Sequence, residues 1–109
     1  MPMSQTLGRV VALVMEGEVR VSEHGYDELA ADGILVRDLV AGIRNAELVE
    51  DYPDFAKGPC ILVLQQDHDG HPVHAVWGIP EDEAGPAVLV TAYRPDPQRW
   101  SDDLRRRMT

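Results

Sequence analysis

The sequence predicts a small α+β domain in which helices pack on one face of a mainly antiparallel sheet. The chain has 109 residues, which is the size of one domain. Apolar residues follow a helical spacing in most of the chain up to Asn45 and a strand-like spacing from Leu48 to Tyr93. The connections between the strand-like runs are too short for parallel crossovers, so we expect neighbouring strands to pair antiparallel.

The first element is an amphipathic helix over roughly residues 4–16. Its apolar residues recur at i, i+3, i+4 and i+7, and they are Leu7, Val10, Val11 and Val14. Ser4 is placed to cap it. We therefore divide the chain into an N-terminal helix, residues 1–17, and one α+β domain, residues 18–107. Alternating residues at Val19–Val21 predict a first strand in that domain.

Two helices follow in close succession. Ser22 is a helix cap and Gly33 a helix stop, and the helix between them is expected to bury Tyr26, Leu29 and Ala30. The next helix carries the same apolar spacing, at Val36, Leu39, Val40 and Ile43. Only a few residues separate the two, so residues 23–44 are predicted to form a helical hairpin.

The rest of the chain predicts a four-stranded meander and a last helix. The strand-like runs are separated by turn signals, and they are Leu48–Tyr52, Cys60–Gln66, Val73–Ile79 and Ala87–Tyr93. Asp96 followed by Pro97 is typical of a helix start. The spacing of Trp100 and Leu104 then predicts a C-terminal helix with both side chains facing the sheet.

Composition limits the possible partners. The formal net charge is −9, which opposes nucleic-acid phosphate as a partner unless a local basic patch exists. Residues 16–54 hold eleven acidic residues against three arginines, whereas arginines gather late in the chain, at Arg94, Arg99 and Arg105–Arg107. The single Cys60 excludes an internal disulfide and a Cys-pair zinc site. Apolar runs are too short to span a membrane, so we expect a cytoplasmic protein with no membrane partner.

Three stretches together resemble a known bacterial family, filed as domain of unknown function 4258. The first is Ser22-Glu23-His24 with Gly33-Ile34, and the second is Glu50-Asp51-Tyr52-Pro53 with Gly58-Pro59-Cys60. The third is Val73-His74-Ala75-Val76 with the tail Thr91-Ala92-Tyr93-Arg94-Pro95-Asp96-Pro97 and Trp100. The resemblance covers about residues 18–106, and the tail is its most specific part. The chain departs from this pattern in two ways. It is acidic, whereas the toxins that the family resembles, described next, are usually basic, and Leu35 stands where a Ser or Thr helix cap is usual.

That family is similar in layout to the RelE/ParE and MqsR-like toxins, which are ribonucleases of toxin–antitoxin modules. The resemblance implies a RelE/ParE-like fold and a metal-independent endoribonuclease with no cofactor. It also implies RNA and a cognate antitoxin, of zinc-finger or helix-turn-helix type, as partners. A homodimer is a further partner that we consider.

Metal-independent RNA cleavage needs a base, an acid and a cation near the 2′-hydroxyl and the phosphate. His24, at a helix N-terminus, and His74, Tyr93 and Arg94 are the candidate catalytic residues. Lys57 and Arg99 are the candidate substrate-binding residues. We expect His24, Tyr93 and Arg94 to converge on one cleft.

Three of these candidates, and a cluster of histidines, also have a structural explanation. Ser22-x-His24 is explained equally by a helix cap whose imidazole bonds the sheet. Arg94 is explained by an ion pair with Asp51 or Asp96, and Lys57 by a solvated loop. His68, His71 and His74 with Asp67 and Asp69 suggest zinc, but a polar hairpin tip accounts for them as well, and we assign no metal ligand.

Two functions from different classes remain. The first is the toxin-like endoribonuclease, and the alternative is a non-catalytic protein-interaction module on the same fold. A small-molecule binding protein is a third and lesser option. A basic cleft beside Tyr93 and Arg94 favours the nuclease, whereas an exposed apolar patch favours the module.

Overall fold

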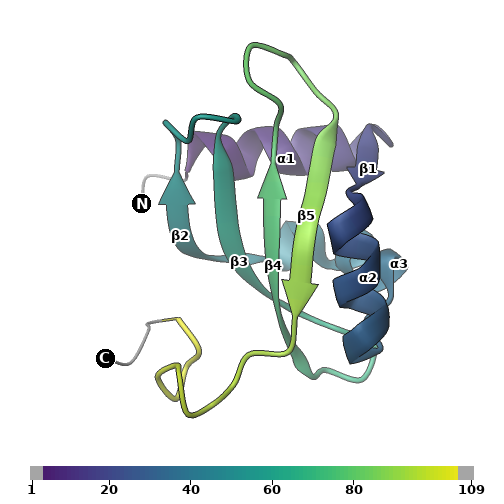
Figure 1. Ribbon diagram of the computed structural model, residues 1–109, viewed down its shortest axis with the longest axis vertical. Coiled ribbons are helices and arrows are strands. Elements are labelled where there is room, and N and C mark those ends of the chain that lie inside the picture. The colour runs from purple at the N-terminus through teal and green to yellow at the C-terminus, as the bar shows by residue number, and fades with distance from the viewer. Residues whose placement is uncertain (1–3, 106–109) are drawn as a thin grey trace.

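A computed structural model describes residues 4–105, which form a five-stranded mixed sheet and three α-helices. The elements are α1 (Gln5–Met15), β1 (Val19–Val21), α2 (Glu23–Asp32), α3 (Val36–Gly42), the short 3-10 helix η1 (Ile43–Asn45), β2 (Glu47–Tyr52), β3 (Cys60–Gln66), β4 (Pro72–Gly78) and β5 (Ala87–Tyr93). The strand order is β1-β5-β4-β3-β2 (Figure 1). The predicted α+β class, the antiparallel meander and the helical hairpin are confirmed.

The first strand, β1, forms one edge of the sheet. β1 pairs parallel with β5, with Val19 opposite Ala87, while all other pairs are antiparallel. β2 is the opposite edge strand, and a bulge interrupts its pairing between Leu48 and Glu50. The sheet is therefore mixed only where the strand preceding α2 lies beside the last strand.

One face of the sheet carries the hydrophobic core. α1, α2 and α3 contribute to it, and α1 crosses behind the strands in Figure 1. The helix residues in the core include Val10, Leu29 and Leu39, and the sheet residues include Val63 and Trp77. Because α1 shares this core with the sheet, it packs as part of the same folded unit.

A buried polar link joins α3 to the sheet. The Gln65 Nε2 donates to the Leu39 carbonyl at 2.9 Å, and the Trp77 Nε1 donates to the Gln65 Oε1 at 2.9 Å. Buried polar groups must be paired in this way to avoid the cost of desolvation. Trp77 is fully buried.

Local capping signals hold in the helical hairpin. The Ser22 hydroxyl accepts from the Gly25 N–H at 2.9 Å, and Gly33 ends α2 with φ +65°. Leu35 precedes α3 without a side-chain cap. The expected burial is wrong in part, because Tyr26 is 59% exposed and Ala30 is also exposed. Gly25 and Leu29 face β5 instead, which turns Tyr26 away from the sheet.

The predicted C-terminal helix is wrong over the residues that the structure describes. Residues 97–99 form a turn, and no helix follows as far as residue 105. Trp100 is nevertheless 4% exposed, as predicted. Arg106 and Arg107, the end of the late arginine stretch, lie outside the described residues.

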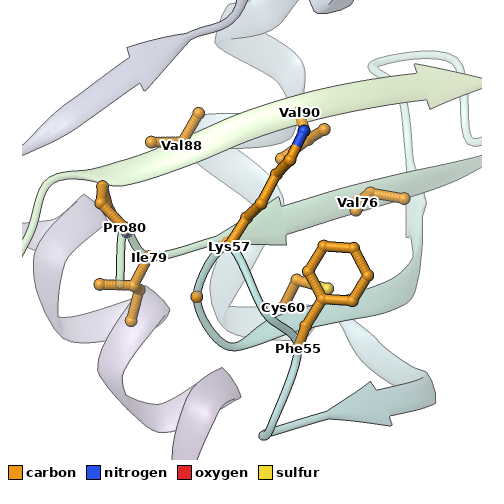
Figure 2. Close-up of a pocket in the computed structure, with 10 residues that line it drawn as sticks. Phe55, Lys57, Cys60, Val76, Ile79, Pro80, Val88 and Val90 are labelled. Carbon is orange, nitrogen blue, oxygen red and sulfur yellow. The ribbon is translucent and has the colours of Figure 1, made fainter. Parts of the chain in front are cut away.

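The second face of the sheet is covered unevenly. At one end, Trp100 packs against His74. At the other end lies a hollow of about 330 Å³, which Figure 2 shows with Phe55, Cys60 and Val90 among its lining residues. We call this the apolar hollow.

Candidate functional site

A second hollow, of about 380 Å³, lies where β5 ends. Its lining residues are Tyr93, Arg94, Asp96, Arg99 and Trp100. Three of the predicted site residues, Tyr93, Arg94 and Arg99, therefore lie around one depression. We call it the β5-end hollow.

His74 lies directly behind this hollow. It is fully buried on β4 and pairs across the strands with Tyr93. Its ring makes edge-to-face contacts with Tyr93 and Trp100, with centroids 5.6 Å and 4.4 Å away. The Nε2 atom lies 2.7 Å from the Leu104 carbonyl. Since a carbonyl only accepts, Nε2 carries the hydrogen that it donates to this oxygen.

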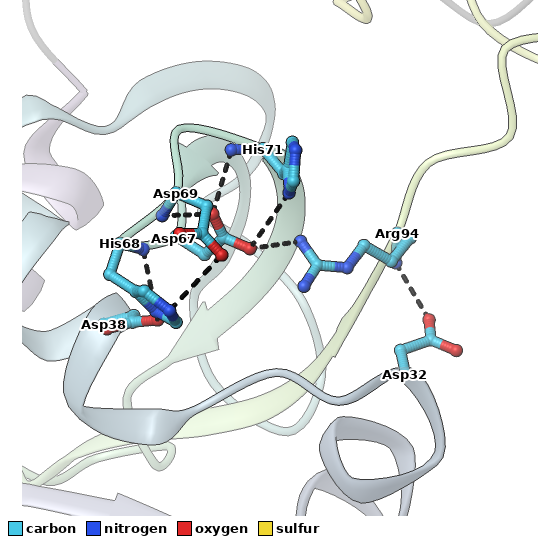
Figure 3. Close-up of polar contacts among 7 residues, drawn as sticks. All are labelled: Asp32, Asp38, Asp67, His68, Asp69, His71 and Arg94. Atoms are coloured by element: carbon cyan, nitrogen blue, oxygen red, sulfur yellow. Dashed lines mark hydrogen bonds and ion pairs between the residues drawn. The ribbon is translucent and has the colours of Figure 1, made fainter.

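Arg94 is fixed by two carboxylates from distant parts of the chain. Its backbone N–H donates to the Asp32 Oδ2 at 2.9 Å, and its Nη1 lies 2.8 Å from the Asp67 Oδ2 (Figure 3). The expected pairing with Asp51 or Asp96 is therefore wrong. Asp67 lies in the turn between β3 and β4, and no pattern in the sequence marks it as a partner for Arg94. The guanidinium is held in place, yet its side chain remains 35% exposed.

The Asp67 carboxylate accepts hydrogen bonds from two backbone N–H groups in addition to its ion pair with Arg94. Its side chain is 5% exposed, and its Oδ1 accepts the backbone N–H groups of Asp69 and His71, each at 2.9 Å. Burial opposes ionisation, but the N–H group of His71 and the guanidinium of Arg94 outweigh it, so the pKa of Asp67 is lowered. Asp67 is therefore an anionic anchor for Arg94.

Arg99 is a second cation at this hollow, and it is more exposed than Arg94. Its side chain is 84% exposed, and its Nε lies 3.9 Å from the Asp96 Oδ2. An exposed pair at that distance contributes little to stability. Arg99 is consequently available to an anionic ligand in the β5-end hollow.

His24 and Lys57 are not among the residues that line the β5-end hollow. His24 is exposed near the start of α2 and lies 3.4 Å from Glu28, while Asp32, which holds Arg94, ends that helix. Eight residues of helix separate them, about 12 Å at 1.5 Å per residue. Ser22, and not the imidazole, bonds the sheet, through its hydroxyl to the Val90 carbonyl at 2.7 Å. Lys57 lines the apolar hollow instead.

The histidines of the β3–β4 turn do not gather with His74. His68 lies 2.7 Å from Asp38 and 3.4 Å from Asp69 (Figure 3). His74, in contrast, is buried and packs against Tyr93. Asp67, Asp69 and His71 do come together, with one ligand atom of each within 4.8 Å of the others. Both Asp67 oxygens already have N–H or guanidinium partners, which account for the position of this carboxylate.

The chain is thus a small α+β protein in which helices cover one face of a mixed sheet and a hollow lies at the end of β5. The family model of the domain of unknown function DUF4258 matches residues 21–94, and the chain belongs to that family. No significant match was found among curated proteins or among solved structures. Within residues 4–105, no helix has the length and apolar character needed to cross a membrane.

Proposed function

We propose that this chain is a toxin-like, metal-independent endoribonuclease that acts at the β5-end hollow. The observation that carries the proposal is the grouping of Tyr93, Arg94 and Arg99 around one depression, with His74 packed behind Tyr93. Arg94 and Arg99 supply the anion-binding cations and Tyr93 the proton donor for phosphodiester cleavage by an internal 2′-hydroxyl. Solvent water takes the proton of the 2′-hydroxyl, because the candidate base His24 does not line this hollow.

Each residue has a distinct role in this proposal. Arg94 binds the scissile phosphate, because its ion pair occupies Nη1 and a guanidinium has five N–H donors. Arg99 binds an adjacent phosphate as an exposed cation. Tyr93 donates a proton to the leaving oxygen. His74 positions the Tyr93 ring through its edge contact.

The acidity of the chain extends to this hollow, since its two arginines lie beside the carboxylates of Asp32, Asp67 and Asp96. The exposed Arg99 and the remaining donors of Arg94 are what the site offers to phosphate. RNA held by so few phosphate contacts binds weakly. Because only about two phosphates would be neutralised, we expect a shallow dependence of cleavage on salt concentration.

The decisive experiment measures cleavage of single-stranded RNA by matched amounts of folded protein. Tyr93→Phe removes only a hydroxyl and is expected to lower the rate by about 10²–10⁴-fold, the usual effect of losing a positioned acid. Arg99→Ala is expected to weaken RNA binding without unfolding the chain, since the side chain is exposed. Arg44→Ala removes another exposed arginine, in η1, and serves as the matched control.

Growth on expression gives an independent readout of the same proposal. A wild-type chain that neither cleaves RNA nor slows growth rejects the nuclease. Activity that is unchanged in both Tyr93→Phe and Arg99→Ala keeps the nuclease but rejects this site. In that case His24, on the other end of α2, becomes the residue to test.

A further inference from the structure

The apolar hollow lies on the opposite half of the outer sheet face from His74. Its lining comes from three strands and two loops, and Figure 2 shows Phe55, Cys60, Val76, Pro80, Val88 and Val90 around it. Lys57 is the only charged residue in the lining. A volume of about 330 Å³ holds one or two large apolar side chains of another molecule.

Two of the lining side chains remain open to solvent. Phe55 is 51% exposed and Val90 is 36% exposed. The contrast with the other half of the same face is clear, because Trp100 and Leu104 there contact His74. Exposed apolar side chains around a hollow are typical of a surface that another molecule covers.

Exposed acidic residues stand next to lining residues of the apolar hollow in the chain. Asp54 precedes Phe55, and Glu81 and Asp82 follow Pro80, all three exposed. The loop that carries Glu81 lies against Lys57, since the Glu81 N–H donates to the Lys57 carbonyl at 3.1 Å. On β2, Asp51 is close enough to Cys60 to add to the effect of burial in raising the pKa of the thiol.

We infer that the apolar hollow docks a basic segment of a partner protein, one that presents apolar side chains flanked by arginine or lysine. Apolar side chains fill the hollow, and the flanking cations face the acidic residues next to its lining. The same acids oppose RNA and other anions at this face. They also oppose a second copy of this chain, whose net charge is −9. This inference does not depend on the proposed nuclease.

The test selects peptides from a random library displayed on phage, using the full chain as the target. Fluorescence anisotropy then measures the affinity of the selected peptides. We expect them to combine arginine or lysine with aromatic or aliphatic residues. Phe55→Ala and Val90→Glu are each expected to weaken binding about tenfold or more, the usual loss for a central contact. Tyr26→Ala, which removes an exposed aromatic ring on α2, is the matched control.

A charge test separates this inference from simple apolar binding. The double variant Asp54→Lys with Glu81→Lys is expected to weaken binding, and added salt is expected to weaken it in the wild type only. Selected peptides that are acidic or neutral would overturn the inference. So would a failure to select any peptide, or peptides whose affinity is unchanged in Phe55→Ala and Val90→Glu. A wild-type dimer that Val90→Glu converts to a monomer would assign the hollow to a second copy instead.

Discussion

At the scale of single residues, His68 shows how the β3–β4 turn is tied to α3. Its Nδ1 lies 2.7 Å from the Asp38 Oδ2, and its backbone N–H donates to the same oxygen at 3.2 Å. The hydrogen bond with Asp38, and then the charge of Asp69, raise the pKa of His68. The hydrogen bond from His68 lowers the pKa of Asp38. Both shifts favour the charged pair.

This pair predicts a pH dependence of stability. A raised pKa means that His68 stabilises the fold below its ordinary value of 6.5, and that this contribution is lost as the pH rises through the folded pKa. A lowered pKa means that Asp38 contributes above its ordinary value of 3.8 and loses its contribution at lower pH. We therefore expect the pair to stabilise most between these two values.

The measurement is the urea midpoint of unfolding against pH. The difference between the wild type and Asp38→Asn is expected to be largest near about pH 5 and to shrink by about pH 9. His24→Gln removes an exposed imidazole elsewhere and is the control. A difference that is constant across this range would show that the His68–Asp38 contact does not form as a charged pair.

The side-chain partners within the candidate site are what could be predicted least from the sequence. Arg94 was identified as a candidate from its place at the end of a strand, and its position beside Tyr93 and Arg99 agrees with that. Its partners Asp32 and Asp67 lie in other elements, and pattern reasoning at one strand end contains no information about them. His24 was grouped with Arg94 because the end of the last strand was expected to lie beside the start of the helix. In the structure Arg94 contacts Asp32 at the end of α2, whereas His24 lies near the start of that helix.

At the scale of elements, α2 and β5 approach each other so closely that only a glycine fits between them. A Cβ atom at Gly25 would lie 2.9 Å from the carbonyl oxygens of Leu89 and Val90. The approach is closest at a bulge in β5, where the register with β4 shifts and Val90 has no opposite residue. The Ser22 hydroxyl bonds the carbonyl at that bulge.

We therefore predict opposite effects for two glycine substitutions in helices. Gly25→Ala is expected to destabilise the chain by about 1–3 kcal/mol, because backbone atoms must shift. Gly8→Ala in α1, where nothing lies within 4 Å of the new atom, is expected to stabilise it by about 0.5–1 kcal/mol. Urea unfolding of both variants checks this. Stabilisation by Gly25→Ala would show that α2 can move away from β5.

The segment after β5 shows why its helix prediction failed. The start signal at Asp96 is real, since its Oδ1 accepts from the Gln98 N–H at 2.8 Å, but it caps only a turn. Leu104 has φ +60°, in the left-handed region, and its carbonyl bonds His74. Packing against the sheet therefore overrides the local preference for a helix, as tertiary contacts often do.

Trp100 is expected to hold this segment in place. Since it is 4% exposed and packs on His74, Trp100→Ala should cost about 3–5 kcal/mol, the usual loss for a buried aromatic ring. Trp100→Phe, which keeps part of the ring contact, should cost less. Guanidinium unfolding gives both values. A loss below about 1 kcal/mol for Trp100→Ala would mean that the segment is only loosely attached.

At the scale of the whole molecule, periodicity and turn signals were sufficient to predict the sheet. β3 and β5 have the predicted bounds, β2 begins one residue earlier than predicted, and β4 both begins and ends one residue earlier. Turn residues and alternating apolar positions are local properties, so they are readable from one sequence. The apolar hollow was not predicted, because its walls combine a loop near Phe55 with strands far along the chain, and no local pattern marks a surface of that kind.

The parallel pairing of β1 with β5 has a consequence for how the chain folds. The β3–β4 hairpin pairs residues that are close in the sequence, whereas Val19 and Ala87, which pair in β1 and β5, are separated by most of the chain. Contacts between such distant residues carry a large entropic cost, so they form late and slow the whole reaction. β5 also carries Tyr93 and receives α2, whose last residue holds Arg94. We therefore expect the packing of α2 on β5, and with it the bond between Asp32 and Arg94 beside the β5-end hollow, to form after the β3–β4 hairpin.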